Sequence, residues 1–188
     1  MSTPSPDLQQ QPTAAADSTE PGLIPASFKA AFAYGDGLYK WTPAQAARFE
    51  WIGHITVTGD PAAAAYARFQ DIERFDAAPE QFPLFAAHRL ELKHSCGIGY
   101  ASLDLVPAVV DELFKASMGS DPWMLWVAWW WGRDVPPTRS QVMAEIWRRG
   151  VDIPPDRVAA CQWKNGATHD TTALYEPHVL HRPQGWPS

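Results

Sequence analysis

The segment from Trp123 to Trp131 contains nine consecutive apolar residues, five of them tryptophans, and it lies between Pro122 and Gly132. At roughly 1.5 Å per residue, a helix of this length covers about half of a bilayer's hydrocarbon core, so the segment cannot span a membrane. Neither a helix nor a strand leaves it a polar face. The segment therefore predicts a central strand or a short buried helix, and any exposed part is expected to contact a partner or a membrane surface.

The ends of the chain differ in composition from its middle. Residues 1–22 are rich in Ser, Thr, Pro, Gln and Ala and contain no aromatic residue. Such a stretch buries too little apolar surface to offset its chain entropy, so a disordered tail is expected there. A second, proline-rich tail is expected at 167–188. One globular domain is then predicted at 23–166, a length that can bury a substantial core.

Charge and cysteine content restrict the class of protein. The formal net charge of −6 disfavours general binding to nucleic acid, because a phosphate backbone attracts a basic face. Two cysteines make no disulfide framework. The first residues show no basic segment followed by an apolar one, so no secretion signal is recognised and a cytoplasmic location is expected.

Capping signals divide the domain into helices and strands. Thr42, Asp60 and Thr138 are each followed by the proline or glutamine that favours a helix start. Helices are predicted at 43–52, 60–75, 104–118, 138–150 and 156–164, and strands at 36–41 and 54–59 and twice within 88–105. This pattern predicts an α/β or α+β fold, a single mixed domain in which a small sheet is flanked by helices.

Residues 36–59, DGLYKWTPAQAARFEWIGHITVTG, resemble a unit of the ParB and sulfiredoxin-like domains. That unit has a strand that begins with Asp-Gly, an Ala-rich helix with an aromatic residue, a terminal glycine and a β-branched strand. The family includes plasmid proteins that suppress DNA transfer, among them fertility inhibitors of the oncogenic-suppression type. The family's phosphate-binding Gly-x-x-Arg is missing, and Lys40-Trp41-Thr42-Pro43 stands in its place.

The resemblance implies that a nucleotide phosphate, as of ATP or CTP, lies at the start of the helix. Free backbone N–H groups and the helix dipole attract anions there. Lys40, Thr42 and Gln45 are the residues that would bind it. The alternative is that Thr42 and Gln45 only cap the helix.

Asp76, Glu91 and Lys93 follow a spacing that is similar to the Asp…Glu-x-Lys pattern of a restriction-nuclease-like superfamily. There two carboxylates hold Mg²⁺ and the lysine positions the attacking water. The alternative is a solvated strand face. His94 and Cys96 raise a second catalytic hypothesis, a nucleophilic thiol, against a structural cysteine as the alternative.

Four residues near the end of the chain are candidate zinc ligands. They are Cys161, His169, His178 and His181, of which only the last two are closely spaced. Surface histidines are the alternative interpretation.

The arginines of 138–164 suggest a second kind of site. The two helices predicted in this stretch resemble a helix–turn–helix, and Arg148 and Arg149 would then contact DNA. A solvated helical hairpin is the alternative.

No Walker-type loop, nucleophile elbow or HExxH motif occurs, which favours binding over catalysis. The chain is therefore predicted to be an accessory or inhibitory protein of a plasmid or phage that binds a partner protein, with nucleotide binding and suppression of DNA transfer as further expectations. A metal-dependent nuclease or nucleotide hydrolase, and a DNA-binding regulator, are the alternatives. The expected partner anchors are Trp126, Trp129, Trp130, Trp131 and Arg133.

Overall fold

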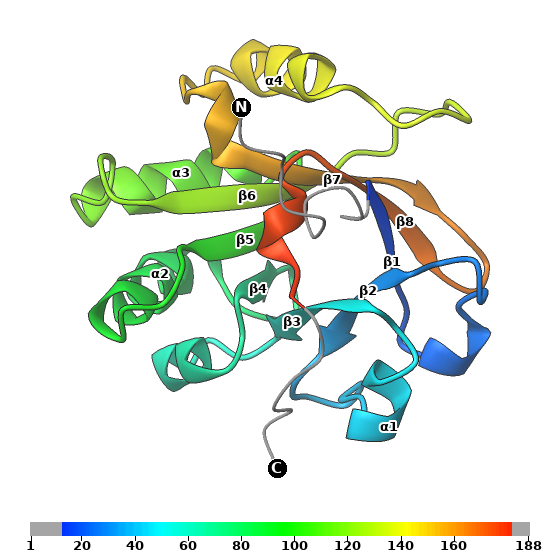
Figure 1. Cartoon of the computed structure of the whole chain (residues 1–188). Coiled ribbons are helices and arrows are strands. Elements are labelled where there is room, and N and C mark those ends of the chain that lie inside the picture. The colour runs from blue at the N-terminus through cyan, green and yellow to red at the C-terminus, as the bar shows by residue number, and fades with distance from the viewer. Residues whose placement is uncertain (1–12, 182–188) are drawn as a thin grey trace, which may run out of the picture.

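A closed β-barrel forms the centre of the protein (Figure 1). The computed structural model describes residues 13–181, and within this range the barrel has eight strands in sequence order. The strands are β1 (Ala14–Asp17), β2 (Ala30–Tyr34), β3 (Trp51–Thr56), β4 (Phe69–Ile72), β5 (Gly97–Ser102), β6 (Trp123–Ala128), β7 (Val158–Asn165) and β8 (Asp170–Leu174).

Strands β1 to β7 run parallel to one another, and β8 closes the ring antiparallel to both β7 and β1. Parallel neighbours need a crossover connection, whereas an antiparallel pair can be joined by a short turn. The chain accordingly places helical segments between the parallel strands and joins β7 to β8 by a hairpin. The carboxyl ends of the seven parallel strands therefore share one end of the barrel with the start of β8.

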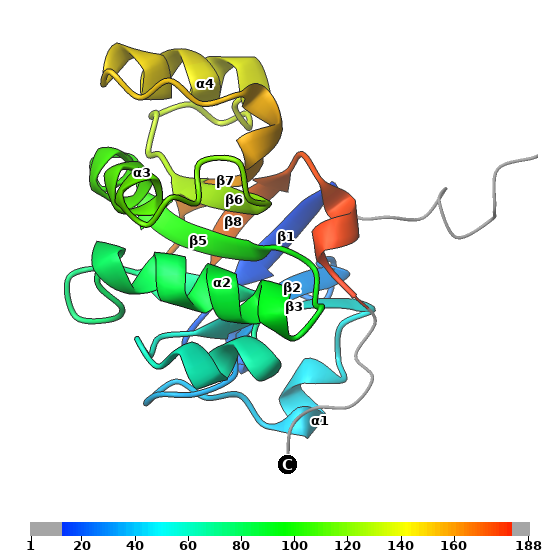
Figure 2. The same cartoon turned by 90° about the vertical axis from the view of Figure 1, so that its left-hand side faces the viewer.

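Helices cover the outside of the barrel, and α2, α3 and α4 lie one above another along the side of β4 to β7 (Figure 2). The α-helices are α1 (Pro43–Ala46), α2 (Phe82–Glu91), α3 (Val106–Lys115) and α4 (Arg139–Arg148). The 3-10 turns are η2 (Pro21–Leu23), η3 (Pro61–Ala65), η4 (Pro79–Gln81), η5 (Pro155–Arg157) and η6 (Pro177–Val179). The capping boxes predicted at Thr42 and Thr138 are both formed.

The barrel interior is a packed aromatic core. Phe32 stacks on Trp126 at 3.9 Å between ring centroids, and Phe69 meets both rings edge-on. Val179 and Leu180, which follow β8, close the end of the barrel at which the parallel strands begin. Because side chains alternate along a strand, every second residue of each strand points into this core.

The first six residues of the tryptophan segment form β6, so of the two predicted alternatives the central strand is the one present. Trp126 points into the barrel and Trp123 packs against the helices, and each side chain is 1% exposed. The segment leaves the sheet after Ala128, and Trp130 is 50% exposed. The apolar run is therefore part core and part surface.

The predicted fold class, a small sheet flanked by helices, is wrong, because the sheet closes on itself. Two segments that were predicted as helices contain strands instead. Residues 60–75 form η3 and β4 in place of one helix, and the predicted helix 156–164 is mainly β7. β4 and most of β7 are buried on both faces, so neither strand shows the alternation of apolar and polar residues that marks a half-buried strand.

The strand predicted at the start of 88–105 is wrong, since these residues end α2. Leu90 and Leu92 alternate with charged residues, which imitates a strand. The buried face of α2 instead follows helical spacing, with Phe82, Phe85 and Arg89 three and four residues apart. The second strand of that stretch is present as β5.

The barrel also extends into both predicted tails. The predicted N-terminal tail contains β1, and the predicted C-terminal tail contains β8. Residues 1–12 and 182–188 lie outside the described part of the chain. Among residues 13–181, no helix has the length and apolar character needed to cross a membrane.

Candidate active site at the carboxyl end of the barrel

Carboxylates from three strands meet at the end of the barrel where the parallel strands finish, here called the mouth. Ala15 and Phe69 belong to the barrel core, so alternation directs Asp17 and Asp71 to the same interior face. Asp170 pairs with Asp17 in the register of β8 and β1. In barrels of eight parallel strands the active site lies at this end, because strand ends and their loops bring side chains together there, and β1 to β7 share that arrangement.

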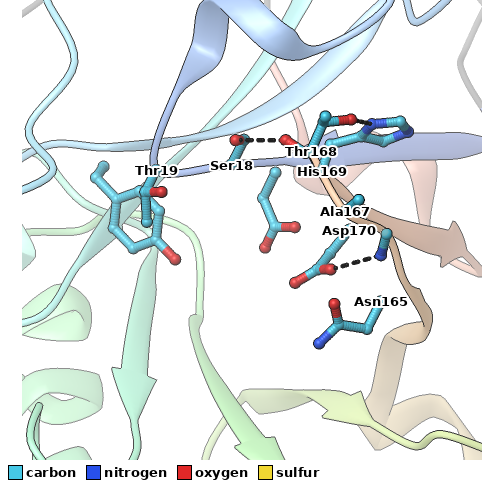
Figure 3. A pocket seen from close by; sticks show the side chains of 10 residues that line it. Ser18, Thr19, Asn165, Ala167, Thr168, His169 and Asp170 are labelled. Carbon is cyan, nitrogen blue, oxygen red and sulfur yellow. Dashed lines mark hydrogen bonds between the residues drawn. The ribbon is translucent and has the colours of Figure 1, made fainter.

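A hollow of about 200 Å³ opens between the end of β1 and the β7–β8 hairpin. Figure 3 shows Asp170 and Asn165 of the hairpin on one side of it and Ser18 and Thr19 on the other. The Ser18 hydroxyl donates to the carbonyl of Thr168 at 2.8 Å and ties the two loops together. The Asp170 carboxylate accepts from Gln162 Nε2 at 2.7 Å and from the backbone N–H of Gly166 at 3.2 Å. Asp170 is therefore held in a fixed orientation.

Asp71, Glu73 and Asp76 form a compact carboxylate group at the end of β4. One oxygen from each lies within 4.8 Å of the other two. Asp71 is 5% exposed, and its Oδ1 is without a hydrogen-bond partner among the described residues. The same holds for Oδ1 of Asp17, which is 6% exposed. Buried carboxylate oxygens without a donor are costly, so these atoms indicate that the site is built for a proton or a cation.

Crowding and burial shift the acids of the mouth towards the protonated form. Burial, followed by the charges of Glu73, Asp76 and Asp17, raises the pKa of Asp71 to about 9. Burial and then the charge of Asp170 raise the pKa of Asp17 to about 8. Burial likewise raises the pKa values of Glu73, Asp76 and Asp170. These shared influences place the five acids in one electrostatic group.

Two tyrosines of the mouth belong to the same group. Burial raises the pKa of Tyr34 and of Tyr100 well above the usual value, and the nearby carboxylates raise both further. Both phenols are therefore neutral hydrogen-bond donors. Asp36, by contrast, is occupied, because it accepts from Thr56 Oγ1 and Tyr66 OH at 2.5 Å each and from the Val57 N–H at 2.9 Å.

The predicted nuclease triad is divided by the barrel. Asp76 belongs to the mouth, whereas Glu91 ends α2 and Lys93 follows it, shortly before β5 begins at the opposite end. The Glu91 carboxylate instead pairs with His88 at 3.2 Å, and both Glu91 and Lys93 are exposed. The strand that would have put Glu91 and Lys93 on one face is a helix end.

Thr42 and Gln45 bind each other. The Thr42 N–H donates to Gln45 Oε1 at 2.6 Å, and the Gln45 N–H donates to the Thr42 hydroxyl at 3.3 Å. Lys40 is exposed beside them. The helix α1 that they begin has four residues, too few for a strong dipole, so their geometry favours the capping alternative. A nucleotide at Lys40 stays a prediction.

The four candidate zinc ligands lie in different places. Cys161 is buried on the outer face of β7, and His169 lies at the mouth beside Phe28. His178 and His181 follow β8 at the other end, where the His181 ring lies 4.9 Å from that of His54. Burial raises the pKa of the Cys161 thiol to about 12. Among the described residues, the potential ligands that gather in a group of three are instead Asp71, Glu73 and Asp76.

The predicted partner anchors differ in how far they are buried. Trp126 is inside the barrel and is removed from this set. Trp129 and Trp131 are half-buried with their rings 5.4 Å apart, and Trp130 and Arg133 are exposed. Binding of a partner protein through these four residues stays a prediction.

The predicted DNA-binding hairpin is not formed, because its second helix is the buried strand β7. The first helix is present as α4, and there Arg149 pairs with Glu145 at 2.7 Å and Asp104 at 3.1 Å, while Arg148 also pairs with Glu145. The prediction of a helix–turn–helix at 138–164 is therefore wrong.

Comparison of the chain with protein-family models, curated proteins and solved structures finds no significant match. Membership of 36–59 in the ParB family therefore stays a prediction, but a ParB-like fold is wrong, because the sheet is a closed barrel and the strand predicted at 36–41 is not formed. In the fold, this stretch supplies α1 and β3 of the barrel.

Of the acids at the mouth, the sequence indicated Asp76 as a site residue but not the others. Asp17 follows AAA, Asp71 lies within FQDIE, and Asp170 begins DTTAL. An acid within or next to a short strand-length run was the available signal, but it is informative only once these runs are known to be neighbouring strands.

Proposed function

We propose that the protein is a divalent-cation-dependent hydrolase with its catalytic centre at the mouth of the barrel. The observation that carries this proposal is the group of Asp71, Glu73 and Asp76, with a buried Asp71 oxygen that has no donor among the described residues. Carboxylate oxygens are the ligands that Mg²⁺, Mn²⁺ and Ca²⁺ prefer. A cation there would offset the burial and the mutual repulsion that raise the pKa values of these acids.

The roles of the residues follow from their surroundings. Asp71, Glu73 and Asp76 would hold the cation, which lowers the pKa of a water molecule bound to it. Asp17, with a pKa near 8, is suited to accept or return a proton close to neutral pH. Asp170 is oriented by Gln162 and Gly166 and helps to set the pKa of Asp17. Tyr34 would donate a hydrogen bond to a polar substrate, and the Tyr100 hydroxyl, whose hydrogen bond lowers the pKa of Glu73, would orient that ligand.

Calorimetric titration with Mn²⁺, Mg²⁺ and Ca²⁺ tests the binding step. We expect one site in the wild-type protein and an affinity lower by about 10-fold or more in Asp71→Asn, because a neutral amide replaces a charged ligand and even the loss of a residue behind a ligand costs that much. Glu91→Gln is the matched control, since it removes an exposed carboxylate at the other end of the barrel. Equal affinities of Asp71→Asn and the wild type would overturn the assignment.

Hydrolysis is tested with chromogenic ester, phosphodiester and glycoside substrates in the presence of the cation that binds. Activity should disappear with EDTA and with Asp71→Asn, and it should fall strongly with Asp17→Asn. Activity that persists in EDTA would show that the carboxylates act without a metal, and the cation-dependent mechanism would be wrong.

A further inference from the structure

A second hollow, of about 300 Å³, adjoins the mouth between the segment after β6 and the end of β7. Its lining includes Trp130, Arg133, Asp134, Trp163, Lys164 and Asn165. We call Trp130, Trp163, Arg133 and Lys164 the tryptophan rim. The rim consists of flat aromatic side chains and long cationic ones, in contrast to the acidic mouth.

The local structure fixes the rim in place. The Trp129 N–H donates to the Gln162 carbonyl at 2.8 Å, which extends the pairing of β6 and β7 beyond the strand and brings Trp130 near Trp163. The Trp131 indole N–H donates to the Val135 carbonyl at 3.0 Å. Gly132 has a φ of +70°, a conformation that glycine adopts without strain, and it turns the chain back.

The rim is continuous with the mouth. Asn165 lines both the second hollow and the mouth hollow that contains Asp17 and Asp170. On its other side, Arg133 lines a further hollow with Trp129 and Trp131. An extended molecule could thus lie along the aromatic residues with one of its units at the carboxylates.

The charges of the rim favour a ligand that bears phosphates. The Arg133 guanidinium lies 4.9 Å from the Trp131 ring centroid, and the Lys164 ammonium lies 5.9 Å from that of Trp163. Lys164 is 3.6 Å from Asp134, but both side chains are largely exposed, so this ion pair is weak and exchangeable. The indoles of Trp131 and Trp163 are partly exposed and that of Trp130 is exposed, and cations next to such rings match a strand in which phosphates alternate with bases.

We propose that the tryptophan rim binds single-stranded nucleic acid, with bases on Trp130 and Trp163 and phosphates at Arg133 and Lys164. Bases of a single strand have free faces for stacking, whereas those of a duplex are stacked on each other. Cleavage of a phosphodiester at the mouth rests on the proposed hydrolase function, whereas binding at the rim does not. The net charge of −6 means that attraction must come from this local surface.

Fluorescence anisotropy of a labelled oligothymidylate, in EDTA and at low salt, tests the binding. Trp130→Ala should weaken binding about fivefold or more, since stacking on an aromatic side chain contributes about 1–3 kcal/mol per base. Arg133→Ala should weaken binding and reduce the slope of log affinity against log salt by about 0.7. Trp147→Ala is the matched control, because Trp147 is 48% exposed on α4 and lines neither hollow.

The proposal is overturned if the oligothymidylate does not bind, if Trp147→Ala weakens binding as much as Trp130→Ala, or if a neutral glycan oligomer competes equally well. Capture of a protein in place of the oligonucleotide would assign the rim to a protein partner and equally overturn it. Asp71→Asn separates the two proposals, since this variant should still bind the oligothymidylate at the tryptophan rim in EDTA. Oligonucleotide binding without any cation binding would leave the rim assignment intact and remove the hydrolase.

Discussion

Asp17 and Asp170 occupy paired positions of β1 and β8, so two aspartates from opposite ends of the chain face the same side of the barrel mouth. Paired residues of antiparallel strands have Cβ atoms only about 4.5–5.5 Å apart. The charge of Asp170 therefore adds to burial in raising the pKa of Asp17. The strand pair that closes the barrel thus also creates the electrostatic character of its mouth.

Asp17→Asn should change how the stability of the cation-free protein depends on pH. The pKa of Asp17 is raised from 3.8 to about 8 on folding. Between these two pH values the folded state therefore holds a proton on Asp17 that the unfolded state has lost. Its stabilising contribution is complete below the unfolded pKa and is lost as pH rises through the folded pKa. The variant should therefore match the wild type near pH 4 and exceed it in stability near pH 8.

Urea unfolding in EDTA at several pH values measures this difference. Asp152→Asn, at an exposed aspartate, is the control and should leave the profile unchanged. Parallel profiles of Asp17→Asn and the wild type between pH 4 and pH 8 would contradict the prediction.

Gly53→Ala should destabilise the barrel by about 1–3 kcal/mol, the usual cost of inserting a methyl group into a filled core. A Cβ at Gly53 would lie 2.7 Å from Phe32, 2.8 Å from Phe69 and 2.9 Å from Leu180. Gly22→Ala is the control, since a Cβ there meets nothing within 4 Å. Chemical denaturation of both variants measures the effect, and equal stabilities would show that the interior is loosely packed.

Trp126→Ala should lower the free energy of unfolding by about 3–5 kcal/mol, as expected when a large aromatic core residue is truncated. The indole stacks on Phe32 and meets Tyr100 edge-on at 4.5 Å. Trp130→Ala should change stability by less than about 0.5 kcal/mol, because that side chain lies at the surface. The two variants thus distinguish a core tryptophan from a surface tryptophan within one segment. Similar losses of unfolding free energy in both variants would contradict the prediction.

Arg89→Met should destabilise the connections around α2. The buried Arg89 side chain donates to the carbonyls of Ala64, Ala67 and Ser95. Ala64 and Ala67 are buried, and each of their carbonyls left unpaired costs about 1–3 kcal/mol. Hydrogen exchange should accelerate in η3 and at the start of β4, whereas the exposed Arg74→Met should leave it unchanged. Unchanged hydrogen exchange in Arg89→Met would show that these hydrogen bonds do not stabilise η3 and the start of β4.

Several elements are determined by local sequence alone. The helix starts at Thr42 and Thr138 follow from capping residues that bond within their own turn. The burial of β6 follows from a run with no polar face. These features depend on contacts between residues a few positions apart, so the sequence carries them without reference to the rest of the chain.

The barrel and its mouth were decided only by tertiary structure. The short runs AAAD and DTTAL have no strong strand preference, and they become β1 and β8 because each pairs with two neighbours and removes an open sheet edge. The strands β4 and β7 lack a readable period because both of their faces are buried. Asp17, Asp71 and Asp170 become one site because the parallel strands end, and the antiparallel β8 begins, at the same mouth. This relationship exists between segments far apart in the chain and not within any of them.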